Sequence, residues 1–142
     1  MKSHVLPLPR LLLEQLRHTE QNPTFHAEGN VLNHTQAVLN EFLVSESRLR
    51  LPESLQEVLY WTAVLHDLGK IKVTTWRNGK WSARGHEAAG CPMARKILQQ
   101  NPSLSQHQKR QILMLIRWHH LPLRWMVDKN PLLDFKDRRA HV

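Results

Sequence analysis

The sequence contains one cysteine, Cys91, among its 142 residues. This excludes an internal disulfide framework and is consistent with a reducing compartment. Charged residues interrupt every apolar run within about ten residues, well short of the length that crosses a bilayer, so we expect no membrane span. The first nine residues lack the apolar core and the cleavage pattern of a signal peptide. These absences lead us to expect a cytoplasmic protein that is not attached to a membrane.

Acidic residues and glycines are also scarce. Twelve Asp and Glu stand against 20 Lys and Arg, which gives a formal net charge of +8 with the histidines neutral. A positive balance favours polyanionic partners such as nucleic acid or nucleotides, although it does not determine a fold. The five glycines leave most of the expected helix interiors glycine-free. The chain has no internal repeat, and its length most simply predicts one domain, 1–142, with a core that needs no covalent staples.

Helical periodicity dominates the distribution of apolar residues. It predicts five main helices, over residues 11–18, 31–44, 54–68, 86–100 and 105–120. Between 73 and 84, Asn78-Gly79 predicts a turn between two short extended pieces. Residues 123–142 are expected to be irregular, with one further turn around 134–139. The sequence therefore predicts an all-α bundle of about five to seven helices, with a loop or small hairpin inserted after His66-Asp67.

The pair His66-Asp67 follows the apolar run 58–65 and precedes Leu68-Gly69-Lys70. An ionised carboxylate in an apolar element is costly unless it is paired, hydrogen-bonded or bound to a metal. We expect a largely buried helix that carries both groups inward and ends at Gly69, followed by Lys70 as a mobile positive charge. This combination suggests a buried metal site with a phosphate-attracting cation at its mouth. The alternative for Lys70 is a cation near a helix C-terminus that interacts with the helix dipole.

Three of the predicted helices each direct a histidine inward near one end. His34, His66 and His119 share the apolar faces of their helices, and His120 borders the last of these faces. Imidazole suits transition metals, and a carboxylate extends the choice to harder ions. The alternatives are a hydrogen-bonded core histidine at 34, a polar first-turn residue at His86, and a C-terminal pair at 119 and 120 that the helix dipole favours.

These segments resemble the HD-domain superfamily of metal-dependent phosphohydrolases, which is named for its adjacent His-Asp pair. His66-Asp67-Leu68-Gly69-Lys70 matches the signature of the family. Residues 22–35 resemble the first-histidine segment of the HD domain in bacterial tRNA nucleotidyltransferases, and residues 74–90 and 117–122 resemble its third and fourth histidine segments. HD modules fused to polynucleotide kinases also share an Arg-Gly-His segment and an Arg-aromatic-His segment before Leu-Pro. The resemblance spans residues 22–123.

The sequence contains no nucleotidyltransferase carboxylate motif and no P-loop lysine sequence. Two arrangements therefore stay open. The chain is either a stand-alone HD protein or a module that is fused to a kinase or transferase domain in a parent protein. Its oligomeric state is open as well.

The resemblance implies an HD-domain helical bundle that binds one or two divalent metal ions, drawn from Mn, Ni, Co, Fe, Mg and Zn. It implies that Asp67 bridges two ions, because a shared anion offsets their repulsion, and two such ions can clamp the attacking and leaving oxygens of a phosphoryl displacement. The late aspartate of such sites is assigned to Asp128, ahead of Asp134 and Asp137, because it follows the last helix most closely. The complete set of expected metal ligands is His34, His66, Asp67, His86, His119, His120 (replacing or assisting His119) and Asp128.

The resemblance also implies 2′,3′-cyclic phosphodiesterase, 2′-nucleotidase or phosphatase activity on a nucleotide or an RNA end. Asp67 and Lys70 are the expected catalytic residues, with Lys70 holding a phosphate oxygen. The expected substrate-binding residues are Lys70, Arg77, Lys80 and Arg84, and the tryptophans proposed to stack bases at the rim are Trp76, Trp81, Trp118 and Trp125. Core packing is the alternative for at least half of these tryptophans. The rival function is a catalytically silent RNA- or nucleotide-binding module with a structural metal.

Overall fold

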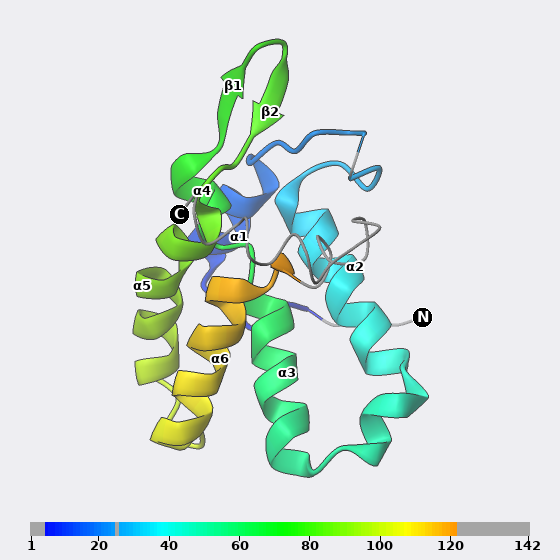
Figure 1. Ribbon diagram of the computed structural model, residues 1–142, viewed down its shortest axis with the longest axis vertical. Coiled ribbons are helices and arrows are strands. Elements are labelled where there is room, and N and C mark those ends of the chain that lie inside the picture. Colours follow the sequence, from blue (N-terminus) through cyan, green and yellow to red (C-terminus); the bar gives the residue numbers. More distant parts are fainter. Residues whose placement is uncertain (1–4, 25, 122–142) are drawn as a thin grey trace, which may run out of the picture.

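The computed structural model describes residues 5–24 and 26–121, which form a bundle of helices with one small projecting hairpin (Figure 1). The described elements are, in chain order, α1 (Arg10–Arg17), α2 (Val31–Val44), the 3-10 helix η1 (Glu46–Arg50), α3 (Glu53–Leu65), α4 (Lys70–Val73), β1 (Thr75–Arg77), β2 (Lys80–Ser82), α5 (His86–Gln99) and α6 (Gln106–Trp118). The prediction of an all-α bundle with a hairpin after the His-Asp pair is confirmed. The short elements η1 and α4 were not predicted, because four or five residues span little more than one helical turn, so an apolar pattern does not repeat within them. The turn predicted at 134–139 lies outside the described residues.

Across the ranges 5–24 and 26–121, no helix has the length and apolar character needed to cross a membrane.

Local capping determines where the functional helices begin. At the start of α2, the side chain of Asn30 accepts a hydrogen bond from the backbone N–H of Asn33 at 2.9 Å. At the start of α6, Ser105 and Gln108 cap each other reciprocally. Helix α5 follows Gly85, whose φ of 83° lies in the left-handed region that glycine adopts without strain. Because the caps satisfy N–H groups that have no partner inside the helix, they fix the starting points of helices that carry candidate histidines.

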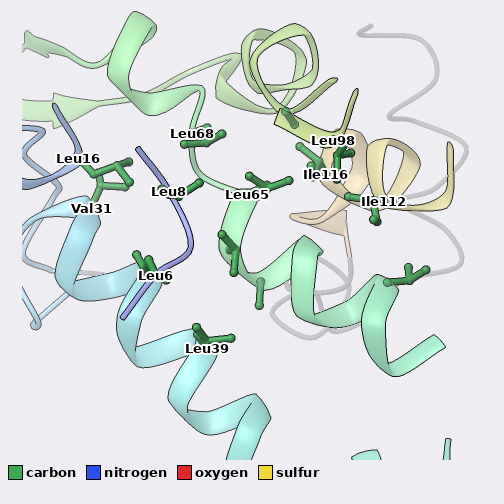
Figure 2. Packing of buried hydrophobic residues seen from close by; sticks show 14 of the residues in the cluster. Leu6, Leu8, Leu16, Val31, Leu39, Leu65, Leu68, Leu98, Ile112 and Ile116 are labelled. Atoms are coloured by element: carbon green, nitrogen blue, oxygen red, sulfur yellow. The ribbon is translucent and has the colours of Figure 1, made fainter. Parts of the chain in front are cut away.

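The core connects the C-terminal end of α3 to α5 and α6. Helix α6 packs against both α3 and α5, and α2 packs against α3. Figure 2 shows Leu65 of α3 near Leu98 of α5 and Ile112 and Ile116 of α6, and each of these side chains is at most 1% exposed. Full burial of an aliphatic side chain of this size contributes about 1.5–3 kcal/mol. The residues that directly follow Leu65 are therefore held at a rigid junction of three helices.

The N-terminal residues cover another part of the core. Leu6 and Leu8 precede α1 and are buried, and Leu16 of α1 lies beside Val31 of α2 (Figure 2). Helix α1 packs against α2 and α4. The segment before α2 is therefore part of the packed structure around the His-Asp junction.

Helix α3 ends at Leu65, three residues before the predicted end at 68. His66 is its C-cap, and the chain then continues in tight turns, in which the backbone N–H of Lys70 bonds to the carbonyl of Asp67 at 3.1 Å. Gly69 makes this path possible, because a Cβ at that position would lie 1.9 Å from the carbonyl oxygen of His86. This contact between two backbones requires glycine and brings Asp67 up to the first turn of α5.

The hairpin has the geometry that its sequence predicts. Asn78 and Gly79 both have positive φ, of 53° and 75°, as a two-residue type I′ turn requires. Trp76 pairs with Trp81 across the two strands. Figure 1 shows the hairpin extending beyond the helices from its base near α4 and α5.

Candidate metal centre

The carboxylate of Asp67 is the centre of the site. Asp67 is 2% exposed. Its Oδ2 lies 3.3 Å from Nε2 of His34 and 3.2 Å from Nε2 of His66. Its Oδ1 lies 3.1 Å from Nε2 of His86 and 3.5 Å from Nε2 of His119. Four of the predicted ligand histidines thus converge on the fifth predicted ligand, from α2, the end of α3, the start of α5 and the end of α6.

The other ring nitrogen of these histidines already has a partner. In three rings Nδ1 donates to the backbone carbonyl three residues earlier: His66 to Ala63 at 2.8 Å, His86 to Ala83 at 2.9 Å, and His119 to Ile116 at 2.7 Å. Because a carbonyl oxygen only accepts hydrogen bonds, Nδ1 carries a hydrogen, and Nε2 is the nitrogen that faces Asp67. In the neutral ring this Nε2 offers a lone pair to a cation, and in the protonated ring it donates a hydrogen bond to the carboxylate. Metal-ligating histidines are held in this way, with the second ring nitrogen donating to a carbonyl or carboxylate.

The arrangement of Nε2 atoms fits a cation. Nε2 of His86 and Nε2 of His119 are 3.1 Å apart, so two neutral rings would direct lone pairs at each other unless a positive charge lies close to both. Two groups of donors have all their ligand atoms within 4.8 Å of one another: His34, His66 and Asp67 form one, and Asp67, His86 and His119 form the other. Two imidazoles and a shared carboxylate suit a divalent transition metal in each group.

Asp67 is electrostatically stabilised as an anion. Burial opposes its ionisation, but the charge of His66 and hydrogen bonds from His119, His66 and His86 outweigh burial and hold the pKa of Asp67 well below its usual range. Burial also disfavours the charged form of His119, which lowers its pKa. The hydrogen bonds to Asp67 and to the carbonyl of Ile116 raise the pKa of His119 by more, so it lies above the ordinary value. The site is therefore a buried negative centre surrounded by cation-accepting nitrogens.

Comparison with protein families agrees with this geometry. The family model of the HD domain matches residues 31–140. The chain belongs to the HD domain family. Searches of curated proteins and of solved structures found no match. Membership of the HD family places the chain in a superfamily of metal-dependent phosphohydrolases that bind divalent metals, and the matched range contains all the residues around Asp67 described above.

In this HD domain Lys70 is buried, and the expectation of a mobile cation at the mouth is wrong. Lys70 is 7% exposed. Its Nζ donates to Oδ2 of Asp67 at 3.1 Å and to Oε1 of Gln21 at 2.8 Å. The tight turn between Asp67 and Lys70 contributes to this, because it places Lys70 one turn after Asp67 and on the same side. The ion pair and the second hydrogen bond offset the cost of burying the ammonium group.

Gln21 is a site residue that the sequence analysis missed. It is 7% exposed, and its Nε2 donates to the carbonyls of Gly29 at 3.1 Å and Asn30 at 3.2 Å. Since Asn30 caps the helix that carries His34, this one amide connects Lys70 to the start of α2. A single glutamine in the polar stretch between two helices gives no pattern from which this role could be predicted. Gln21 also precedes the range that the HD family model matches.

Glu28 is the second missed residue. One of its oxygens, Oε1, forms a very short contact with Nδ1 of His34, and the hydrogen bond from His34 lowers the pKa of Glu28. His34 is thus oriented by a carboxylate, whereas the other three rings use backbone carbonyls. The ring of His26 packs edge-on against His34, with centroids 4.6 Å apart, and His26, Glu28 and His34 form a further group of potential donors. The only sequence signal for this role was that an acidic residue, Glu28, lies six residues before the candidate ligand His34.

Of the remaining predicted metal ligands, one lies outside the two donor groups at Asp67 and the other lies outside the described residues. Nδ1 of His120 lies 2.9 Å from Oε1 of Glu87, and His120 belongs to neither donor group around Asp67. Asp128 lies outside the described residues, as does Trp125. The assignments of His120 and Asp128 as ligands stay predictions.

The predicted substrate-binding cations other than Lys70 are all exposed. Arg77 and Lys80 lie on the hairpin, and Arg84 lies two residues before His86. Of the tryptophans, Trp76 and Trp118 are 60% and 46% exposed, which excludes core packing for both. The roles of these residues in substrate binding stay predictions.

Proposed function

We propose that this HD domain is a metal-dependent phosphohydrolase that acts on phosphomonoester or 2′,3′-cyclic phosphodiester bonds of nucleotides or RNA ends. The observation that carries the proposal is the pair of donor groups that share Asp67, with the ammonium group of Lys70 3.1 Å from the same carboxylate. A metal-binding centre with a structural role alone does not need a buried lysine against its shared ligand.

Each residue has a role in this proposal. His34, His66 and Asp67 would hold one metal ion, and Asp67, His86 and His119 would hold a second. When bound, the ions supply positive charge for the transferring phosphoryl group and lower the pKa of water. Lys70 contributes a further fixed cation for a phosphate oxygen. Because two hydrogen bonds already hold its ammonium group, little reorganisation is needed as charge develops.

Two observations support a nucleotide or an RNA end as the substrate. The chain has a formal net charge of +8, and the segment that joins Lys70 to His86 carries three exposed cations, at Arg77, Lys80 and Arg84. The segments around the histidines resemble the HD domains of tRNA nucleotidyltransferases and of kinase fusions, whose substrates are RNA ends. Both observations favour an anionic substrate that is larger than inorganic phosphate.

The test is a metal-by-substrate screen of the full chain. The protein is stripped with a chelator, reloaded separately with Mn, Ni, Co, Fe, Mg or Zn, and assayed with bis-p-nitrophenyl phosphate, 2′,3′-cyclic AMP, 2′-AMP and 3′-AMP. We expect turnover with at least one metal, and its loss in His119→Ala. The matched control is His107→Ala, because His107 is exposed near the start of α6, away from Asp67. A protein that binds metal through these histidines but hydrolyses none of the substrates would instead be the silent binding module.

A further inference from the structure

The hairpin connects the two halves of the metal centre. It leaves α4, which begins at Lys70, and returns through Ala83, whose carbonyl accepts the hydrogen bond from Nδ1 of His86 at 2.9 Å. Figure 1 shows that its turn extends away from the helices. A chain-like ligand bound along the hairpin would therefore have one end close to the residues around Asp67.

Exposed aromatic surface distinguishes this hairpin. Trp76 is 60% exposed, and its ring meets that of Trp81 edge to face, with centroids 5.2 Å apart and an interplanar angle of 75°. A two-stranded hairpin on its own is only marginally stable, so the contact between the rings helps to hold the two strands together. The contact also fixes Trp76 while leaving more than half of it accessible, as a platform for a flat ligand requires.

A pair of like charges lies closer to the turn, and because successive side chains alternate across a strand, it projects from the face opposite the tryptophans. Arg77 lies directly opposite Lys80 in the strand register, one residue closer to the turn than the tryptophans. Like charges in this relation destabilise a hairpin. Among the ion pairs of residues 5–24 and 26–121, none involves Arg77, Lys80 or Arg84. Their positive charge is therefore available to an anion from outside the described chain.

We propose that the hairpin is a binding arm for single-stranded RNA, in which Trp76 stacks on a base and Arg77 and Lys80 contact phosphates. The inference rests on the proposed function, because that function places the end of the strand at the metal centre. A stacking platform beside cations is the general solution for single strands, whose bases have free faces. The bases of a duplex are stacked on each other and do not offer these faces, so the arm discriminates against double-stranded RNA.

Binding is measured by fluorescence anisotropy with the full chain, a labelled 12-nucleotide oligouridylate and a chelator that prevents hydrolysis. Trp76→Ala is expected to weaken binding about fivefold or more, since stacking on one base contributes roughly 1–3 kcal/mol. Trp76→Phe keeps an aromatic face and should retain most of the affinity. It also guards against an unfolded hairpin in the alanine variant.

The charge of the arm is tested through salt dependence. The double variant Arg77→Gln/Lys80→Gln should make the log–log dependence of affinity on salt shallower by about 0.7 for each phosphate contact that is lost. The matched control is Lys96→Gln/Arg110→Gln, which removes the same charge from exposed positions near the other end of α5 and α6. The control should leave the slope close to that of the unmodified chain.

Three results would overturn the arm: equal affinities of Trp76→Ala and the unmodified chain, equal slopes of the two charge variants, or duplex RNA bound as tightly as the single strand. The arm and the proposed function fail separately, because binding is measured without metal. Intact, Trp76-dependent binding without turnover of any phosphoester overturns the function and leaves the arm. Turnover combined with any of the three results above overturns the arm and leaves the function.

Discussion

The two oxygens of the Asp67 carboxylate have surroundings that are built in different ways. On the Oδ1 side, His86 and His119 are both oriented by the backbone carbonyl three residues earlier. On the Oδ2 side, the carbonyl of Ala63 orients His66 in the same way, but the carboxylate of Glu28 orients His34, and the amide of Gln21 holds Lys70. The Oδ1 half of the centre thus follows from local backbone geometry, and the Oδ2 half depends in addition on side chains from the segment before α2. The HD motif alone therefore does not supply all the residues that orient the side chains around Asp67.

The largest effect is expected where the two sides meet. Asp67→Asn removes the shared negative charge, so both donor groups should lose metal affinity. Removing a group that only hydrogen-bonds to a metal ligand typically lowers metal affinity or activity by about 10–100-fold. Loss of the shared ligand itself should therefore lower activity by at least about a hundredfold. Metal content after desalting and kcat are the measurements, with circular dichroism to confirm the helices. Normal metal content would show that the two sides do not share this carboxylate.

Glu28→Gln should affect the Oδ2 side alone. It replaces the carboxylate that orients His34 with a neutral amide, so we expect metal affinity or kcat to fall by about 10–100-fold. Calorimetric titration with Mn should show one weakened ion and one nearly unchanged ion. The control is Glu41→Gln, an exposed acid on α2, the helix that carries His34. If the two variants titrate alike, the contact between Glu28 and His34 does not orient the ring.

Lys70→Ala separates charge at the centre from metal binding. The variant should keep its metal, while kcat falls more than tenfold, which is about 1.4 kcal/mol of transition-state stabilisation. The matched control is Lys72→Ala, because Lys72 lies on the same short helix but is exposed. Unchanged kcat at full metal occupancy would show that Lys70 forms an ion pair with Asp67 but does not take part in catalysis.

The smallest effect on activity is expected from Gln21→Ala, which acts through Lys70. The variant removes the side-chain donor to the carbonyl of Gly29 and one acceptor of Lys70, and it leaves the carbonyl of Asn30 with the N–H of His34 alone. Each such loss costs about 1–3 kcal/mol, so the free energy of unfolding should fall clearly in a urea titration. The expected signature in catalysis is a fall in kcat of a few fold with KM little changed. Gln99→Ala, at an exposed position, is the control. Equal unfolding curves for the two variants would contradict the link to α2.

The convergence of His34, His66, His86 and His119 on Asp67 was predicted from the sequence in two steps. Helical periodicity is a local signal that directs His34, His66 and His119 inward, and the resemblance to the HD domain adds His86 and joins the four into one ligand set. The hairpin was also predictable, since Asn78-Gly79 specifies its turn type. The burial of Lys70 was not, because it depends on the contact of Gly69 with the backbone of His86, which brings together residues 17 positions apart. Gln21 was missed for the same reason: its partners are set by tertiary packing, and no periodic pattern records them.

The convergence of four Nε2 atoms on Asp67 also couples metal binding to folding. His34 and His119 are 85 residues apart in the chain, so the unfolded chain does not hold the donor groups together. A metal that binds only the native state stabilises that state by mass action, by about 2.7 kcal/mol when the free metal concentration is a hundred times the Kd. The melting temperature should therefore rise with metal concentration. In this HD domain, metal availability then sets part of the stability of the fold as well as any catalytic rate.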